Sequence, residues 1–193
     1  FTSALLNVGG NLRAIGTTPG GKPWTAGIEN PWDDDPAYIQ AVELADGDSL
    51  VISGDYQRYF EYEGVRYAHL IDLTTGYPAR YVSSVAVLAR AEAGGLADAL
   101  STGLFCLPEQ TGRTLADRNG WAALWMHTDK RTTQSADWPQ SNSKSRRTFG
   151  GSCCIKIVTS MLRVDDGAPV EVAVLQTVDQ DFGGGDVGGN RNV

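Results

Sequence analysis

The chain has 193 residues, a net charge of −7 and 41% apolar residues. This length suggests one domain with room for an appendage, and the apolar content is enough for a packed core. A dominant nucleic-acid role is disfavoured because no basic run precedes residue 144, and no apolar run is long enough to span a membrane.

The first 90 residues read as strands separated by turns. Glu63-Gly64 lies between two runs rich in aromatic and β-branched residues, 56–62 and 65–71, which predicts a β-hairpin. Other short runs alternate with glycine, proline and aspartate turns. They cover residues 4–16 (interrupted at Gly9-Gly10), 24–28, 38–44, 49–52 and 83–89.

Two helices are expected next. Leu96, Leu100 and Leu104 recur at helical spacing, which predicts a helix over 91–107 with these leucines on one stripe. A second helix is expected over 109–119, because Gly120 stands where a C-terminal glycine cap belongs. The run 121–126 then reads as a final strand.

The composition changes after residue 128, which divides the chain into three parts. Residues 1–128 form the predicted folded domain. Residues 129–152 are rich in Ser, Thr, Lys and Arg and are predicted to be a disordered linker. Residues 153–193 are an unassigned extension with a flexible Gly-rich end, although 155–162 and 170–175 have strand character. Cys106, Cys153 and Cys154 show no C-x-x-C spacing, and Cys106 reads as a core thiol.

Asp98 and Thr102 are the candidate metal ligands. They stand four residues apart on the first predicted helix and therefore share a face. A carboxylate and a hydroxyl are hard oxygen ligands of the kind that Mg²⁺ accepts together with water and phosphate. An aspartate near a helix N-terminus is equally explained by the helix dipole, so the spacing alone leaves both interpretations open.

His69 and Asp72 are the second candidate pair. His69 closes an apolar strand, and Thr75-Gly76-Tyr77-Pro78 forces a turn soon after Asp72. This places both side chains at the mouth of a strand, where catalytic residues often lie. A histidine that merely bonds to the turn would produce the same pattern. Gly9, Gly10 and Asn11 offer backbone amides that could approach an anion, which is a weaker signal.

In this order, four segments resemble the FAD:protein FMN transferase (ApbE) family. The segments are Asn-Val-Gly-Gly-Asn at 7–11, Ser-Gly-Asp-Tyr at 53–56, Tyr-x-His-x-Ile-Asp-x-x-Thr-Gly-Tyr-Pro at 67–78, and Ala-Asp-Ala-Leu-Ser-Thr at 97–102. The resemblance covers about residues 4–127. It suggests the C-terminal half of such a protein, so we expect the chain to be a fragment.

The resemblance implies a partial ApbE-like α+β domain in which antiparallel strands pack on helices, with a flexible C-terminal extension. It implies Mg²⁺-dependent transfer of FMN from FAD, the substrate, to a Thr or Ser of an acceptor flavoprotein. By motif, His69 resembles the catalytic base, and Asp98 and Thr102 resemble the metal ligands. The cofactor-binding residues would be Gly9, Gly10, Asn11, Asp72, Thr75 and Gly76.

Two other activities stay open at this point. Water could replace the acceptor hydroxyl, which would make the protein a metal-dependent FAD hydrolase, or the domain could bind flavin without catalysis. The family resemblance implies an extracytoplasmic location, periplasmic or as a membrane-anchored lipoprotein, although the N-terminal residues carry no signal that shows it.

Overall fold

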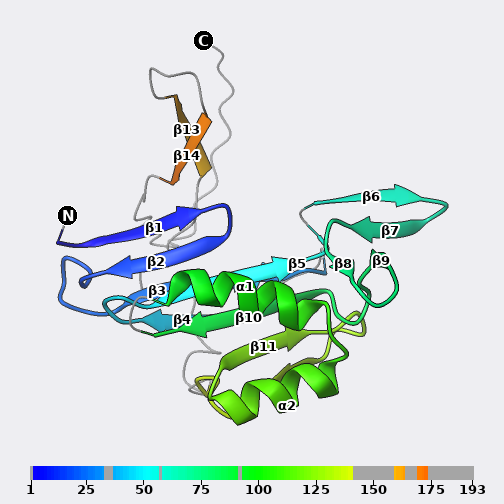
Figure 1. Ribbon diagram of the computed structural model, residues 1–193. Helices are drawn as coiled ribbons and strands as arrows, with labels where there is room; N and C mark the ends of the chain where they lie inside the picture. The colour runs from blue at the N-terminus through cyan, green and yellow to red at the C-terminus, as the bar shows by residue number, and fades with distance from the viewer. Residues whose placement is uncertain are drawn as a thin grey trace, which may run out of the picture.

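The computed structural model describes residues 2–32, 37–56, 58–90, 93–140, 159–163 and 169–173. Its centre is a six-stranded sheet with the order β1-β2-β5-β10-β11-β12, in which every neighbouring pair is antiparallel. Two helices accompany this sheet, which confirms the α+β prediction (Figure 1). The sheet strands are β1 (Ala4–Val8), β2 (Asn11–Ile15), β5 (Ser49–Gly54), β10 (Ser84–Ala89), β11 (Ala122–Met126) and β12 (Thr132–Gln134).

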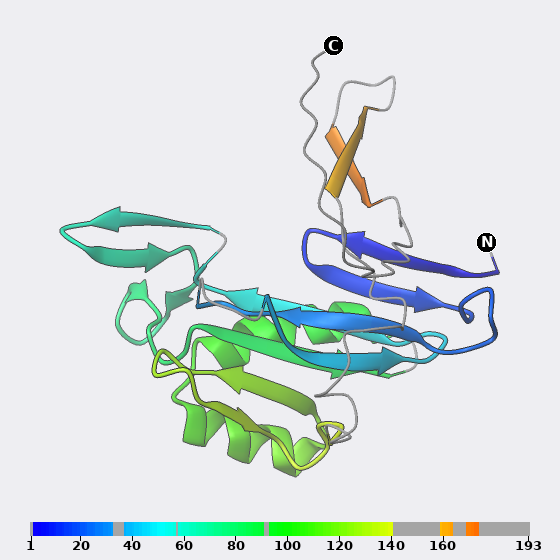
Figure 2. The same cartoon turned by 180° about the vertical axis from the view of Figure 1, so that it is seen from behind.

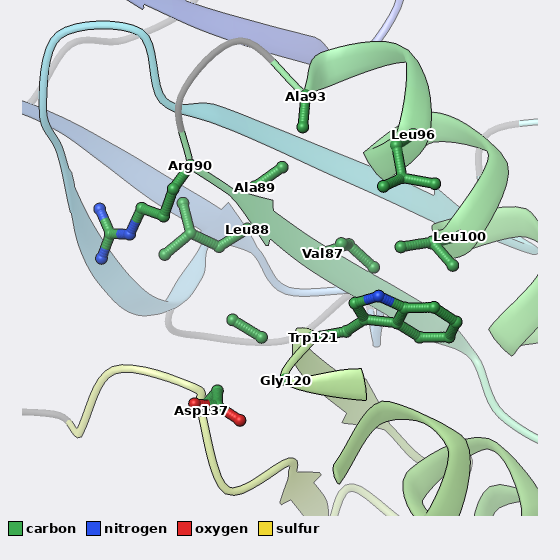
Figure 3. Close-up of a pocket in the computed structure, with 11 residues that line it drawn as sticks. Val87, Leu88, Ala89, Arg90, Ala93, Leu96, Leu100, Gly120, Trp121 and Asp137 are labelled. Carbon is green, nitrogen blue, oxygen red and sulfur yellow. The ribbon is translucent and has the colours of Figure 1, made fainter. Parts of the chain in front are cut away.

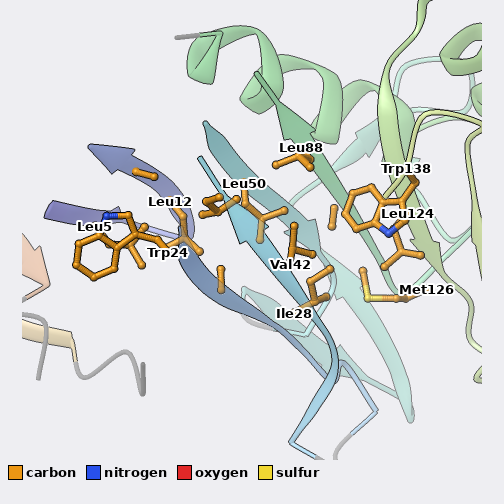
Figure 4. Packing of buried hydrophobic residues seen from close by; sticks show 14 residues of the cluster. Leu5, Leu12, Trp24, Ile28, Val42, Leu50, Leu88, Leu124, Met126 and Trp138 are labelled. Carbon is orange, nitrogen blue, oxygen red and sulfur yellow. The ribbon is translucent and has the colours of Figure 1, made fainter. Parts of the chain in front are cut away.

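The domain has three layers, because both faces of the sheet are covered. Helices α1 (Gly94–Phe105) and α2 (Glu109–Asn119) lie on one face, where Ala97 and Phe105 pack with Val51, Val85 and other apolar side chains. The hairpin of β3 (Trp24–Glu29) and β4 (Tyr38–Leu44) covers the other face (Figure 2). Its side chains join a second core cluster, which Figure 4 shows and which includes Trp24, Ile28, Val42, Leu44, Leu50, Leu88, Leu124 and Met126.

Glycine turns connect the hairpins where the sequence predicts them. Gly9 (φ 59°) and Gly10 (φ 94°) join β1 to β2, and both need the left-handed backbone that a two-residue hairpin turn requires. The hairpin of β6 (Tyr59–Tyr62) and β7 (Val65–Ala68) is confirmed and projects from the end of the main sheet (Figure 1). A smaller hairpin follows, formed by β8 (Ile71–Asp72) and β9 (Tyr77–Pro78).

Both helices are confirmed, and the leucine stripe of α1 is buried at Leu104 but not at Leu96. Its buried residues are Ala97, Ser101, Leu104 and Phe105, whereas Leu96 is 54% exposed. Small side chains at 97 and 101 let the helix lie close to the sheet. Gly120 caps α2 with φ 67°, as predicted. None of the helices in the described ranges is long and apolar enough to cross a membrane.

The predicted boundary at residue 128 is too early. Residues 132–134 form β12, which pairs with β11, and Trp138 is 1% exposed in the core (Figure 4). The Ser135 hydroxyl donates to the Trp121 carbonyl (2.7 Å) and accepts the Ala123 N–H (2.9 Å). This stretch is polar in composition, yet Trp138 and Ser135 are buried in it, and the Ser135 hydroxyl serves two backbone groups.

Two strands in the extension are also confirmed. β13 (Thr159–Arg163) pairs antiparallel with β14 (Pro169–Ala173), and each strand overlaps one of the two predicted runs, 155–162 and 170–175. The predicted disorder of 141–152 and the flexible Gly-rich end both fall outside the described residues.

Candidate functional site

The end of β5 brings a serine against the helix that carries the candidate metal ligands. The Ser53 Oγ lies 2.8 Å from the Ser101 Oγ and 3.3 Å from the Thr102 Oγ1. Ser101 is fully buried and its hydroxyl donates to the Asp98 carbonyl (3.0 Å), whereas Asp98 and Thr102 are exposed. The Asp98 and Thr102 side chains therefore lie on the solvent-exposed side of α1, near the C-terminal end of β5. Ser53 belongs to the Ser-Gly-Asp-Tyr segment, but its contact with α1 joins residues about 48 positions apart and depends on the fold.

The β1–β2 turn lies beside the same end of β5. Asn11 is paired with Val51, so its side chain is on the helix-covered face of the sheet. A Cβ at Gly10 would come within 3.8 Å of the Ile52 carbonyl oxygen, which leaves ordinary contact. The Gly10 N–H donates to the Asn7 side chain (3.2 Å) and is used within the turn. The pairing of β2 with β5 thus places this turn next to Ser53.

Asp72 organises the turn that follows β8. Its carboxylate accepts the Thr74 N–H (2.8 Å) and the Tyr81 hydroxyl (2.9 Å). Both hydrogen bonds favour the charged carboxylate and therefore lower the pKa of Asp72. The bond from the Thr74 N–H has the larger effect. The N–H groups of Thr75 and Gly76 both donate to the Asp72 carbonyl, and Gly76 has φ 72°. Tyr81, which sequence reasoning missed, is therefore the partner that holds this carboxylate.

The Asp72 turn approaches the C-terminal end of α1. Burial raises the pKa of the Cys106 thiol, and the negative charge of Asp72 raises it further. Cys106 is the C-cap residue directly after α1, four positions after Thr102. It is partly buried rather than a fully buried core thiol. The charge of Asp72 thus acts on the residue just after α1, the helix that carries Asp98 and Thr102.

His69 is exposed and lies one residue beyond β7. Its Nδ1 is 3.2 Å from the Arg58 carbonyl oxygen, which also accepts the His69 N–H (3.3 Å). A carbonyl can only accept, so Nδ1 must carry the proton when the ring is neutral. The Nε2 atom is then unprotonated and able to take a proton from another group.

The oxygen donors fit a hard cation that keeps part of its water shell. The candidate donors are the exposed Asp98 carboxylate and, one helical turn later, the Thr102 hydroxyl, which lies 3.3 Å from the Ser53 hydroxyl. Mg²⁺ is commonly held by one or two such protein groups, with water and substrate phosphate as the other ligands. The described residues hold no group of three or more His, Cys, Asp or Glu side chains that could bind a metal. The donor set therefore suits Mg²⁺ with phosphate better than a metal caged by protein alone.

The predicted residues form two neighbouring groups. Ser53 links the Asp98–Thr102 face to β5, and the Asp72 turn with Thr75 and Gly76 lies toward the end of α1. Among the described residues, no hydrogen bond or ion pair joins His69 directly to Asp98 or Thr102. His69 instead follows the β6–β7 hairpin and stands two residues before β8, the strand that carries Asp72.

A separate cavity of about 340 Å³ lies at the other end of α1. Leu96 and Leu100 of α1 line it together with Trp121, and Arg90 and Asp137 stand at its rim (Figure 3). The Arg90 guanidinium pairs with the buried Asp48 carboxylate, so its charge is already matched. None of the predicted site residues lines this cavity.

Comparison with known proteins gives a consistent result. Residues 1–125 match the model of the ApbE family. The FAD:protein FMN transferase of Haemophilus influenzae is 40% identical over 127 residues, which is 65% of this chain and 36% of that protein. The enzyme of the same name from Vibrio cholerae is 40% identical over 116 residues, 60% of this chain and 34% of that protein. The chain thus spans about a third of the length of these curated relatives.

Solved structures agree with the sequence matches. The ApbE protein of Thermotoga maritima has a TM-score of 0.62 at 34% identity, covering 69% of this chain and 43% of that one. The flavin transferase ApbE of Vibrio cholerae has a TM-score of 0.60 at 33% identity, covering 71% and 43%.

Proposed function

Because this chain belongs to the ApbE family, we propose that its function is the Mg²⁺-dependent transfer of FMN from FAD to a threonine or serine hydroxyl of an acceptor flavoprotein. The observation that carries this proposal is the His69 ring. Its Nδ1 is committed to the Arg58 carbonyl, which leaves Nε2 as an exposed proton acceptor.

The reaction exchanges one phosphorus–oxygen bond for another. The acceptor oxygen attacks the phosphorus of the FMN half of FAD, and the bond from that phosphorus to the bridging oxygen breaks. AMP leaves with the bridging oxygen, and FMN becomes joined to the acceptor as a phosphodiester. His69 accepts the proton of the attacking hydroxyl, which is the general-base step that a weak oxygen nucleophile needs.

Asp98 and Thr102 would hold the metal ion, with Ser53 supporting the Thr102 hydroxyl. A bound Mg²⁺ supplies neutralisation of the pyrophosphate charge. The Ser53–Ser101 hydrogen bond ties this part of α1 to the end of β5. That tie limits rotation of the helix and keeps the Asp98–Thr102 face open at the site.

The Asp72 turn would form part of the wall that receives the flavin and phosphates. Its own backbone groups are largely used internally, since Thr75 and Gly76 donate to the Asp72 carbonyl. The Asp72 carboxylate is likewise held by Tyr81 and Thr74. We therefore assign Asp72 the role of shaping the turn, with Gly9, Gly10 and Asn11 bordering the site from the β1–β2 side.

Mass spectrometry of the complete translated protein that contains this chain tests the proposal. The protein is incubated with FAD, Mg²⁺ and an apo-acceptor flavoprotein from the same organism. The acceptor should gain FMN on Thr or Ser, and AMP should appear in equal amount. Free FMN with an unmodified acceptor would indicate an FAD hydrolase, and uncleaved FAD would indicate a flavin-binding module.

A further inference from the structure

The β6–β7 arm exposes an aromatic face that the proposed reaction does not explain. Phe60 is 62% exposed and Tyr62 is 61% exposed. The Phe60 ring stacks on the Tyr67 ring, with centroids 5.0 Å apart and an interplanar angle of 7°. Both figures of the whole chain show the arm extending away from the main sheet (Figures 1 and 2). Contiguous exposed apolar patches are typical of interaction sites.

His69 stands at the base of this aromatic face. The hairpin pairs Phe60 with Tyr67 and Tyr62 with Val65. The bond from the His69 N–H to the Arg58 carbonyl continues the same ladder by one more pair. Because side chains alternate along strands, His69 falls on the same side as Tyr67, two residues before it. A molecule lying along this face would therefore reach His69 at one end.

The two faces of the arm differ in charge. On the aromatic face, Arg58 is exposed, and the Arg80 guanidinium lies 4.9 Å from the Tyr67 ring centroid. The opposite face carries Glu61, and there Arg66 is already engaged with Tyr59 and lies 4.0 Å from the Glu61 carboxylate. The aromatic face is thus locally basic in a chain whose net charge is −7, which suits an acidic partner.

We propose that the aromatic face of the β6–β7 arm, formed by Arg58, Phe60, Tyr62, Val65 and Tyr67, docks the acceptor flavoprotein. The bound part is an extended, acidic segment that lies along the arm and delivers its Thr or Ser to His69. This inference rests on the proposed function and names the surface that the second substrate uses.

The shape of the arm favours a polypeptide over a small ligand. Small molecules bind in concave sites that bury most of their surface, whereas this face belongs to a projecting two-stranded ribbon. Exposed aromatic residues and arginine are the types enriched at protein–protein contacts. The four steps from His69 back to Val65 span about 13 Å at strand spacing, so about four acceptor residues beside the hydroxyl would contact the face.

The test compares three variants of the complete protein. Phe60→Ala combined with Tyr62→Ala removes the aromatic face. Tyr59→Ala is the matched control, because it removes an exposed aromatic ring from the opposite face. Arg80→Glu reverses one charge beside the Tyr67 ring. The probe is the apo form of the flavoprotein that carries FMN on Thr or Ser in the same organism. Acceptor KM, kcat and FAD affinity are measured, and acceptor binding without FAD is measured by calorimetry.

The double variant should raise the acceptor KM and weaken acceptor binding by about tenfold or more, with kcat and FAD affinity within about twofold of wild type. Tyr59→Ala should match wild type, and the Arg80→Glu defect should shrink as salt is added. Unchanged acceptor affinity in the double variant would overturn the proposal, as would a loss of FAD affinity with normal acceptor binding. If the wild type transfers no FMN, the proposed function fails, and calorimetry still decides whether this face binds the acceptor.

Discussion

Trp138 lies in a stretch whose composition predicts a linker, yet its side chain is 1% exposed. It belongs to the same core cluster as Leu124 and Met126 of β11. Its ring N–H donates to the Gln40 side chain on β4 (3.3 Å). Trp138 therefore closes the core between the main sheet and the β3–β4 layer. Truncating a buried tryptophan to alanine costs about 3–5 kcal/mol through lost burial and the cavity left behind.

Urea-induced unfolding of the complete protein measures this cost. Trp138→Ala should lower the free energy of unfolding by about 3–5 kcal/mol. Within the described residues 129–140, no other large apolar side chain lies in the core. Gln40→Ala is the matched control, since it removes mainly the hydrogen-bond partner and should cost only about 1 kcal/mol. A loss below about 1 kcal/mol for Trp138→Ala would refute the reasoning and restore the boundary at residue 128.

Three further predictions concern the site. His69→Ala should slow FMN transfer by about 10²–10⁴ at saturating FAD while FAD binding survives. His127→Gln, which alters the other histidine, should keep the rate. Loss of FAD binding in His69→Ala with an unchanged rate at saturating FAD would make His69 a binding residue. Asp98→Ala should weaken Mg²⁺ binding, measured by titration, more than Thr102→Val does, because water can replace a neutral ligand; equal affinity in wild type and Asp98→Ala would contradict the metal assignment. The lowered pKa of Asp72 means that its contribution to stability is complete above the unfolded value of about 3.9 and is lost as pH falls through the lower folded value; acid unfolding curves should therefore fall less steeply in that range for Asp72→Asn, and identical curves would speak against it.

Local sequence patterns predicted the elements well where a residue type has a strong conformational preference. Gly9-Gly10 marks its hairpin because both positions need positive φ, and Gly120 marks the end of α2 for the same reason. The β6–β7 hairpin follows from its alternating aromatic runs around Glu63-Gly64. These features depend on neighbours in sequence, so no knowledge of the tertiary structure was needed.

Tertiary contacts decided the features that the sequence could not show. Leu96 sits at a helical spacing from Leu104 but is exposed, because Ala97 and Ser101 are the residues that face the sheet. The Ser53 contact with Thr102 joins residues 49 positions apart. Tyr81 holds Asp72 from the far side of a turn. The motifs indicate candidate residues, and only the fold shows which of them are neighbours.

Single-turnover mass spectrometry of the acceptor tests the central claim most directly. The complete protein is mixed with FAD, Mg²⁺ and a limiting amount of apo-acceptor, and the intact mass of the acceptor is followed together with released AMP. The account predicts one FMN joined through its phosphate to a Thr or Ser for each AMP formed. Release of AMP and free FMN with no change in acceptor mass would contradict it.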